Sequence, residues 1–94
     1  MNSKGRFVDR FGMADRVTTD GFFRMPLLEM CADQRVLIEN HKGICSYSRE
    51  KIAVNVTMGQ YVIEGDGLSV LCMSRYQLVI GGSIKMVTID RRDG

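Results

Sequence analysis

The sequence predicts an all-β fold: a small antiparallel meander of about six to eight short strands, preceded by a short N-terminal helix. Short apolar runs recur from Arg35 onward at intervals of about 8 to 10 residues, with polar or glycine-bearing breaks between them. The runs begin near Val36, Ile44, Ile52, Tyr61, Leu68, Leu78 and Ile84. The same spacing also fits a β-solenoid, which stays open as an alternative.

Glycine in the breaks favours the meander. It closes the segments Asn40-His41-Lys42-Gly43, Thr57-Met58-Gly59 and Asp66-Gly67. Because glycine adopts the positive φ that tight hairpin turns require, these segments predict three chain reversals, with Gly43 and Gly59 at positive φ. Two further breaks, residues 48–51 and 74–77, are polar but lack glycine and give a weaker turn signal.

The N-terminal part is expected to differ from the rest. Its apolar residues Phe7, Phe11, Ala14 and Val17 follow the spacing of one helix face, which predicts a short amphipathic helix over residues 6–17. A helix this short needs a surface to pack on, which is the domain itself, a partner or a membrane.

Pro26 places the first strand, because proline cannot donate to a β-ladder and is confined to strand starts and edges. We therefore expect a first or edge strand over Leu27–Cys31. The predicted organisation is a leader over residues 1–24, a β domain over 25–90 and a polar tail over 91–94.

Alternation within the runs divides the side chains between two sheet faces. The predicted core consists of Ile38, Ile52, Val54, Val56, Ile63, Val70 and Ile80. The later runs are apolar on both faces, so a helix, a second sheet layer or another chain is expected to cover the second face. The residues expected on that second face are Leu71, Met73, Val79 and Val87.

Composition narrows the function classes. The 94 residues are 45% hydrophobic and 26% charged, which is typical of a single globular domain. No apolar stretch approaches the roughly 18 residues of a membrane span, and no secretory signal is evident, so a cytoplasmic protein without a direct membrane span is expected. A net charge of +2, with scattered basic residues, does not indicate nucleic-acid binding.

The sequence predicts no enzyme, no metal site and no cofactor. His41 is the only histidine, and its turn-like setting predicts a solvated imidazole rather than a general base. Cys31, Cys45 and Cys72 are odd in number and widely spaced, so we expect buried thiols in a reducing compartment rather than metal ligands.

Four segments of the chain, residues 26–30, 36–44, 64–70 and 78–84, resemble the YabP/YqfC family of sporulation proteins, and most of all its YqfC members. The most specific part is Ile38-Glu39-Asn40-His41-Lys42-Gly43, followed by the apolar Ile44. The resemblance implies a protein of the mother cell, needed to build the spore envelope and peripheral at the forespore membrane. It also implies a membrane-protein partner of the YqfD type, and it brings no catalytic residue.

Two function classes therefore stay open. The first is a non-catalytic structural or assembly factor that binds a partner through a sheet face or edge, or that associates with itself. The second is a β-rich binding module for a small molecule or an envelope polymer. The candidate interaction surface comprises Leu71, Met73, Val79, Val87, Leu28, Glu39, Asn40, His41, Lys42 and Gly43.

Overall fold

The computed structural model describes residues 25–92, and this part of the chain is entirely β. Its strands form one sheet in the order β1-β2-β6-β5-β4-β3, and every pair within these residues is antiparallel. This confirms the all-β, meander-like prediction over the solenoid. The expected helix over residues 6–17 lies outside the described residues. The strands are β1 (Leu27–Cys31), β2 (Arg35–Glu39), β3 (Ile44–Tyr47), β4 (Lys51–Val56), β5 (Gly59–Met73) and β6 (Gln77–Arg91).

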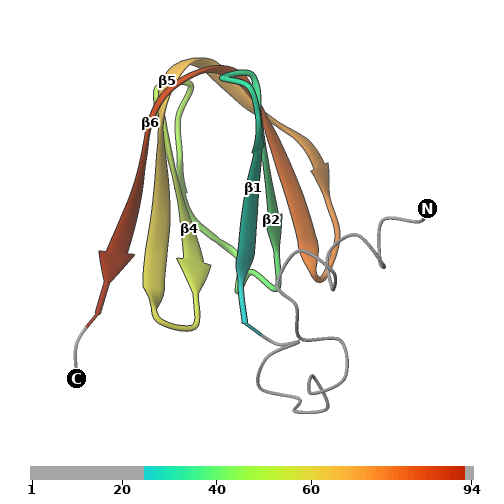
Figure 1. Ribbon diagram of the computed structural model, residues 1–94, viewed down its shortest axis with the longest axis vertical. Coiled ribbons are helices and arrows are strands. Elements are labelled where there is room, and N and C mark those ends of the chain that lie inside the picture. Colours follow the sequence, from blue (N-terminus) through green and yellow to red (C-terminus); the bar gives the residue numbers. More distant parts are fainter. Residues whose placement is uncertain (1–24, 93–94) are drawn as a thin grey trace.

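The two long strands bend in the middle and fold the sheet into an arch (Figure 1). Only residues 77–81 of β6 pair with β2, and only residues 59–64 of β5 pair with β4. The β1–β2 leg therefore contains β1, β2 and the adjoining halves of β6 and β5. The β3–β4 leg contains β3, β4 and the other halves. The bend is the closed end of the arch, and the free tips of the legs form its open end.

Glycines allow the two long strands to bend against each other. A Cβ on Gly65 would lie 2.0 Å from the carbonyl oxygen of Ser83. Gly82 has a φ of +139°, and a Cβ there would lie 2.8 Å from the carbonyl oxygen of Gly67. The predicted reversal at Asp66-Gly67 is wrong, because the chain continues there as β5 with shifted register. Positive φ at Gly67 serves a bulge as well as a turn, and local sequence does not distinguish the two.

The hydrophobic core fills the space between the legs. Six of the seven predicted core residues are buried, and the seventh, Val70, is partly buried and packs against the others. Alternation thus predicted the inner face well, because each strand presents every second side chain to it. The buried cluster comprises Val36, Ile38, Ile52, Val54, Val56, Tyr61, Ile63, Leu68, Leu78, Ile80 and Ile84.

The tight turns use either glycine or serine. Thr57 and Met58 join β4 to β5, and the predicted positive φ is found at Gly59 (149°) and Gly43 (101°). The glycine-free breaks are also turns. The Oγ of Ser48 accepts the N–H of Lys51 at 3.0 Å, and the Oγ of Ser74 accepts the N–H of Gln77 at 3.1 Å. A serine hydroxyl at the first turn position satisfies the backbone there without glycine.

Two bulges change which face certain side chains occupy. The register shifts by one residue at Lys85 in β6 and at Leu71 in β5. Because a one-residue shift moves all following side chains to the other face, Met73 lies opposite the buried Leu78 and Val87 packs against the core. The prediction that Met73 and Val87 lie on the outer face is therefore wrong.

The three cysteines are exposed and free, so the prediction of buried thiols is wrong. Cys31 ends the edge strand β1, and Cys45 lies at an irregularity in the pairing of β3. Cys72 lies opposite Val79 because of the bulge at Leu71. All three positions depend on strand ends and register, which the sequence pattern does not show.

Candidate functional site

The segment that carries the family resemblance connects the two legs. Residues 40–43, here called the crossover loop, lead from β2 in one leg to β3 in the other, so the predicted hairpin turn is wrong. The N–H of Asn40 donates to the carbonyl of Tyr76 at 2.6 Å in the first leg. The N–H of Lys42 donates to the carbonyl of Asn55 at 2.7 Å in the second. The crossover loop therefore ties the legs together at the open end.

His41 strengthens this tie from the inside. Its side chain is buried, with 9% of the residue exposed, so the prediction of a solvated imidazole is wrong. Nδ1 accepts the N–H of Gly43 at 2.9 Å, which leaves the proton on Nε2 to donate to the carbonyl of Ser74 at 3.0 Å. Both ring nitrogens of a neutral imidazole are thereby used. His41 is a structural residue, enclosed because the crossover loop passes over the end of the core.

The other candidates of this region are also tied into the fold. Asn40 has a φ of 61°, and its Nδ2 donates to the carbonyl of Met25 at 2.9 Å. Glu39 accepts the side-chain N–H of Gln77 at 3.2 Å. Leu28 is half-buried and packs against the core. Of the crossover loop, the side chain of Lys42 is exposed.

Two remaining candidates, Leu71 and Val79, share the outer side of the β1–β2 leg with Leu37. Val79 lies opposite Leu37 in β2 and opposite Cys72 in β5, and cross-strand partners point to the same face. Leu71 is 50% exposed, and its Cδ1 occupies the space over Gly81, where a Cβ would be 2.6 Å away. We call Leu37, Leu71 and Val79 the outer apolar face.

A hollow of about 470 Å³ adjoins Leu71 on this side. Gly81 and Gly82 contribute only backbone to its lining, and the Cδ1 of Leu71 lies over Gly81. Asp33 and Arg35 bring opposite charges to its wall. The lining residues are Asp33, Gln34, Arg35, Ser69, Leu71, Gly81, Gly82 and Ser83. At about 470 Å³ the hollow is large enough for a side chain from outside the molecule.

The raised pKa values of Tyr61 and Lys85 both have structural causes. Burial raises the pKa of Tyr61, which is a core residue. The hydrogen bond to Asp66, whose carboxylate lies 2.7 Å from Nζ, raises the pKa of Lys85 at the closed end. In this part of the chain, no three His, Cys, Asp or Glu side chains gather into a metal site. No helix among residues 25–92 is long and apolar enough to cross a bilayer.

Sequence reasoning missed Leu37 and the hollow. A signal for Leu37 was available, because Val36-Leu37-Ile38 is apolar on both faces of its strand. No local signal identifies the hollow, since its lining comes from the β1–β2 turn, from the start of β2 and from both long strands. Only the pairing of those strands brings the lining residues together.

Among the curated proteins and among the solved structures, nothing matches this chain. A family model described as the YabP family matches residues 25–94, which include every strand of the arch and the crossover loop. That family is associated with sporulation. The chain therefore belongs to the YabP family.

Proposed function

We propose that this protein is a non-catalytic assembly factor in endospore formation, which binds a membrane protein at the forespore envelope through its outer apolar face. Family membership supports the link to sporulation. The observation that carries the binding role is Leu71, an apolar side chain that is 50% exposed beside a hollow that it helps to line.

The outer apolar face has the features of a small protein interface. Leu37 and Val79 are half-buried and Leu71 projects, so an apolar centre is available for burial. The polar side chains of Asp33 and Arg35 lie at the hollow beside it. Interfaces combine such an apolar centre with a polar rim, and a few anchor side chains seated in pockets supply most of the affinity.

The partner and the place follow from the resemblance to the family. A membrane protein of the YqfD type would hold this protein at the forespore membrane, on the mother-cell side. A close kinship to YqfC within the family is part of the same proposal. The site residues at the open end, Glu39 to Gly43, then serve mainly to hold the fold together, because their hydrogen bonds are made within the protein.

A second candidate function rests on the same hollow. Its polar lining, with Gln34, Arg35 and Ser69, suits a β-rich module that binds a small molecule or an envelope polymer. A polar ligand would depend on Arg35 more than on Leu71. Substitutions of Arg35 and of Leu71 therefore distinguish the two functions.

The test compares tagged proteins recovered from sporulating cells. The double variant Leu71→Glu/Val79→Glu places charge on the outer apolar face, and Leu71→Glu alone gives a milder change at the more exposed position. Met86→Glu is the matched control, since Met86 is 53% exposed on the other leg. We expect the Leu71 variants to fold, as judged by circular dichroism, and to lose a membrane protein that the parent and the control retain.

Two results would contradict the proposal. One is a folded Leu71 variant that still recovers the membrane protein and supports sporulation. The other is a loss of function with Arg35→Ala alone, while both Leu71 variants stay active, which would favour the ligand-binding module.

A further inference from the structure

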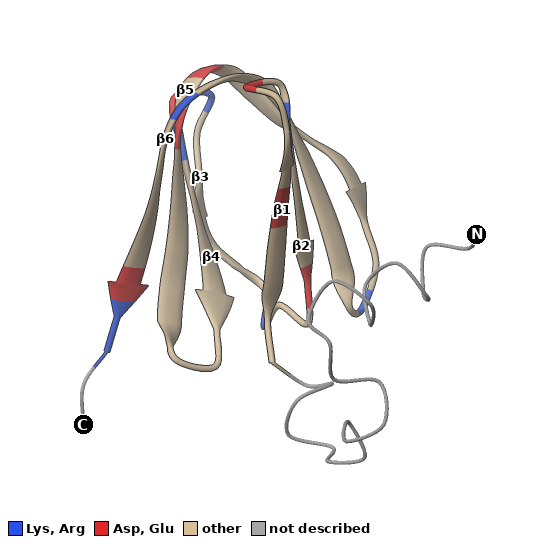
Figure 2. Cartoon of the chain, in the orientation of Figure 1, with Lys and Arg blue, Asp and Glu red and all other residues tan. Residues whose placement is uncertain are grey.

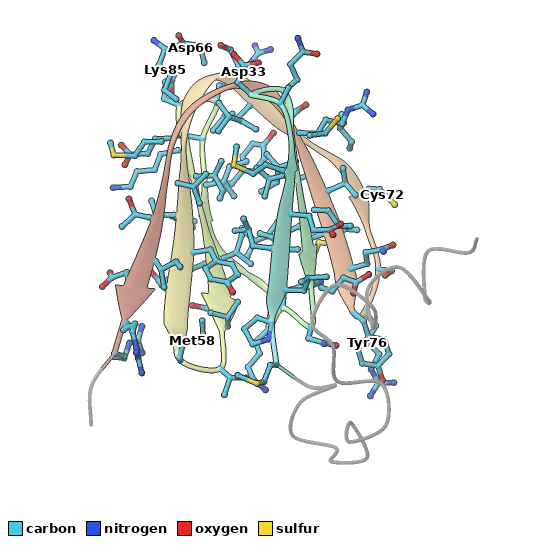
Figure 3. The ribbon with its side chains drawn as sticks, in the orientation of Figure 1. Asp33, Met58, Asp66, Cys72, Tyr76 and Lys85 are labelled. Atoms are coloured by element: carbon cyan, nitrogen blue, oxygen red, sulfur yellow. The ribbon has the colours of Figure 1, made fainter. Side chains whose placement is uncertain are left out.

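The open end of the arch gathers loops from both legs. Met58 lies at the tip of the β3–β4 leg and Tyr76 at the tip of the β1–β2 leg (Figure 3). Met25 lies at the same end, because Asn40 in the crossover loop donates to its carbonyl oxygen. These three apolar or amphipathic side chains belong to separate segments of the chain, but all of them lie at the open end.

The tips are exposed around a shallow hollow. Tyr76 is 60% exposed and Met25 57%, while Met58 is partly buried against the core. The hollow between them measures about 610 Å³. It is lined by Met25, Pro26, Asn40, His41, Lys42, Thr57, Met58 and Tyr76. Met25 and Tyr76 therefore leave most of their surface exposed at the edge of this hollow, beside the partly buried Met58.

Basic side chains accompany these tips. Lys42 and Arg75 are exposed on the loops, and Arg91 and Arg92 are exposed where β6 ends beside the Met58 turn. The guanidinium of Arg75 lies 5.4 Å from the centroid of the Tyr76 ring, so charge and aromatic surface are adjacent. In Figure 2 basic segments mark the tips of both legs.

The acidic side chains of the two ends differ. At the open end, Glu39 is hydrogen-bonded to Gln77, and Asp90 precedes the arginine pair. At the closed end the charges are mixed, and Asp66 is paired with Lys85. Among the described residues, the basic side chains at the open end therefore outnumber the acidic ones.

We propose that the open end is a binding surface for an anionic lipid bilayer. Met25, Met58 and Tyr76 would enter the boundary between headgroups and acyl chains, where aromatic and apolar side chains are favoured. Lys42, Arg75 and the arginine pair would lie against the lipid phosphates. The crossover loop holds the tips of both legs in place through its hydrogen bonds to Tyr76 and Asn55.

Charge complementarity favours a lipid surface over a protein segment in the hollow. The positive charges are spread along the whole end, from β6 to the Tyr76 turn, rather than gathered at the hollow. A broad anionic plane contacts all of them at once, whereas a single peptide in the hollow would contact Lys42 but none of the three arginines, which do not line it. This inference deepens the proposed placement at a membrane, but its test does not need the protein partner.

The experiment measures sedimentation of the full-length protein with vesicles of phosphatidylcholine and phosphatidylglycerol, and with vesicles of phosphatidylcholine alone. We expect binding to the mixed vesicles that weakens with added salt, and little binding to the neutral ones. Lys42→Gln/Arg75→Gln should bind about twentyfold more weakly, since each basic side chain near such a surface contributes about fivefold. Tyr76→Ser should weaken binding at low and at high salt.

A matched double variant at the closed end, Arg49→Gln/Lys51→Gln, removes the same charge from exposed positions and should bind the vesicles as the parent does. Equal weakening by both double variants would overturn the proposal, as would an absence of binding to the mixed vesicles. So would an open-end variant that binds vesicles normally but no longer recovers a protein partner, because the open end is then a protein site. Leu71→Glu should bind vesicles normally, which separates this surface from the outer apolar face.

Discussion

The two ends of the arch join its legs by opposite means. At the closed end two continuous strands cross between the legs, and their backbones come so close that Gly65 has no room for a Cβ. At the open end a single loop crosses, and the buried ring of His41 bonds to its backbone and to the Ser74 turn. One end depends on the absence of side chains, and the other depends on the presence of one.

The polar crossover loop and the glycine-rich bend thus have the same structural task. Both hold the legs around one core. They should therefore fail in different ways when substituted, and the following predictions use that difference, from the largest expected effect to the smallest.

Substitution at the closed end should lower the free energy of unfolding more than substitution at the open end. Gly65→Ala places a Cβ 2.0 Å from the carbonyl oxygen of Ser83, and the contact is with backbone that cannot rotate away. We expect a loss of about 3 kcal/mol or more in the free energy of unfolding, measured by urea denaturation. Gly67→Ala is the control. Nothing lies within 4 Å of its Cβ, and its φ of +61° predicts a loss of only about 1 kcal/mol. Equal losses would show that the strands do not approach closely at the bend.

Substitution of His41 at the open end should lower the stability of the protein, because backbone groups there lose their hydrogen-bond partners. His41→Leu removes the acceptor for the N–H of Gly43 and the donor to the carbonyl of Ser74. We expect a loss of about 2 kcal/mol, with a faster exchange of the Gly43 amide hydrogen. His41→Gln carries both an acceptor and a donor and should lose less. If Leu and Gln are equivalent and Gly43 exchange is unchanged, the ring is not the tie between the legs.

Removal of the exposed ion pair at the closed end should have the smallest effect on stability. Asp66 hydrogen-bonds to Lys85 and raises its pKa above the ordinary value of 10.5, but both side chains are solvated. Because the pKa of Lys85 is raised in the folded state, the stabilisation by the ion pair is complete at pH values below the pKa of Lys85 in the unfolded chain. It is lost as the pH rises through the pKa of Lys85 in the folded protein. Asp66→Asn should therefore lower the melting temperature slightly at neutral pH. The difference from the parent should vanish at a pH above the titration of Lys85, and a difference that persists there would contradict this origin.

The sequence by itself determined the class of the fold and most of its inner face. Period-two alternation placed Ile52, Val54 and Ile63 in the core, because a strand must turn every second side chain the same way. Pro26 placed the start of β1, and Gly59 marked a true hairpin, because both residues act through their own backbone geometry. These features are local, so a local pattern was sufficient to predict them.

Only the tertiary structure decided what the glycines at the bend and the crossover loop do. Gly65 to Gly67 looks like a turn until two long strands are paired across it, and His41 looks solvated until a second leg closes over it. The faces of Met73 and Val87 depended on one-residue bulges whose effect appears only against a partner strand. Register and the close approach of distant backbones are non-local, which is why the sequence predicted Leu71 and Val79 on the outer face but not the hollow beside them or the basic open end.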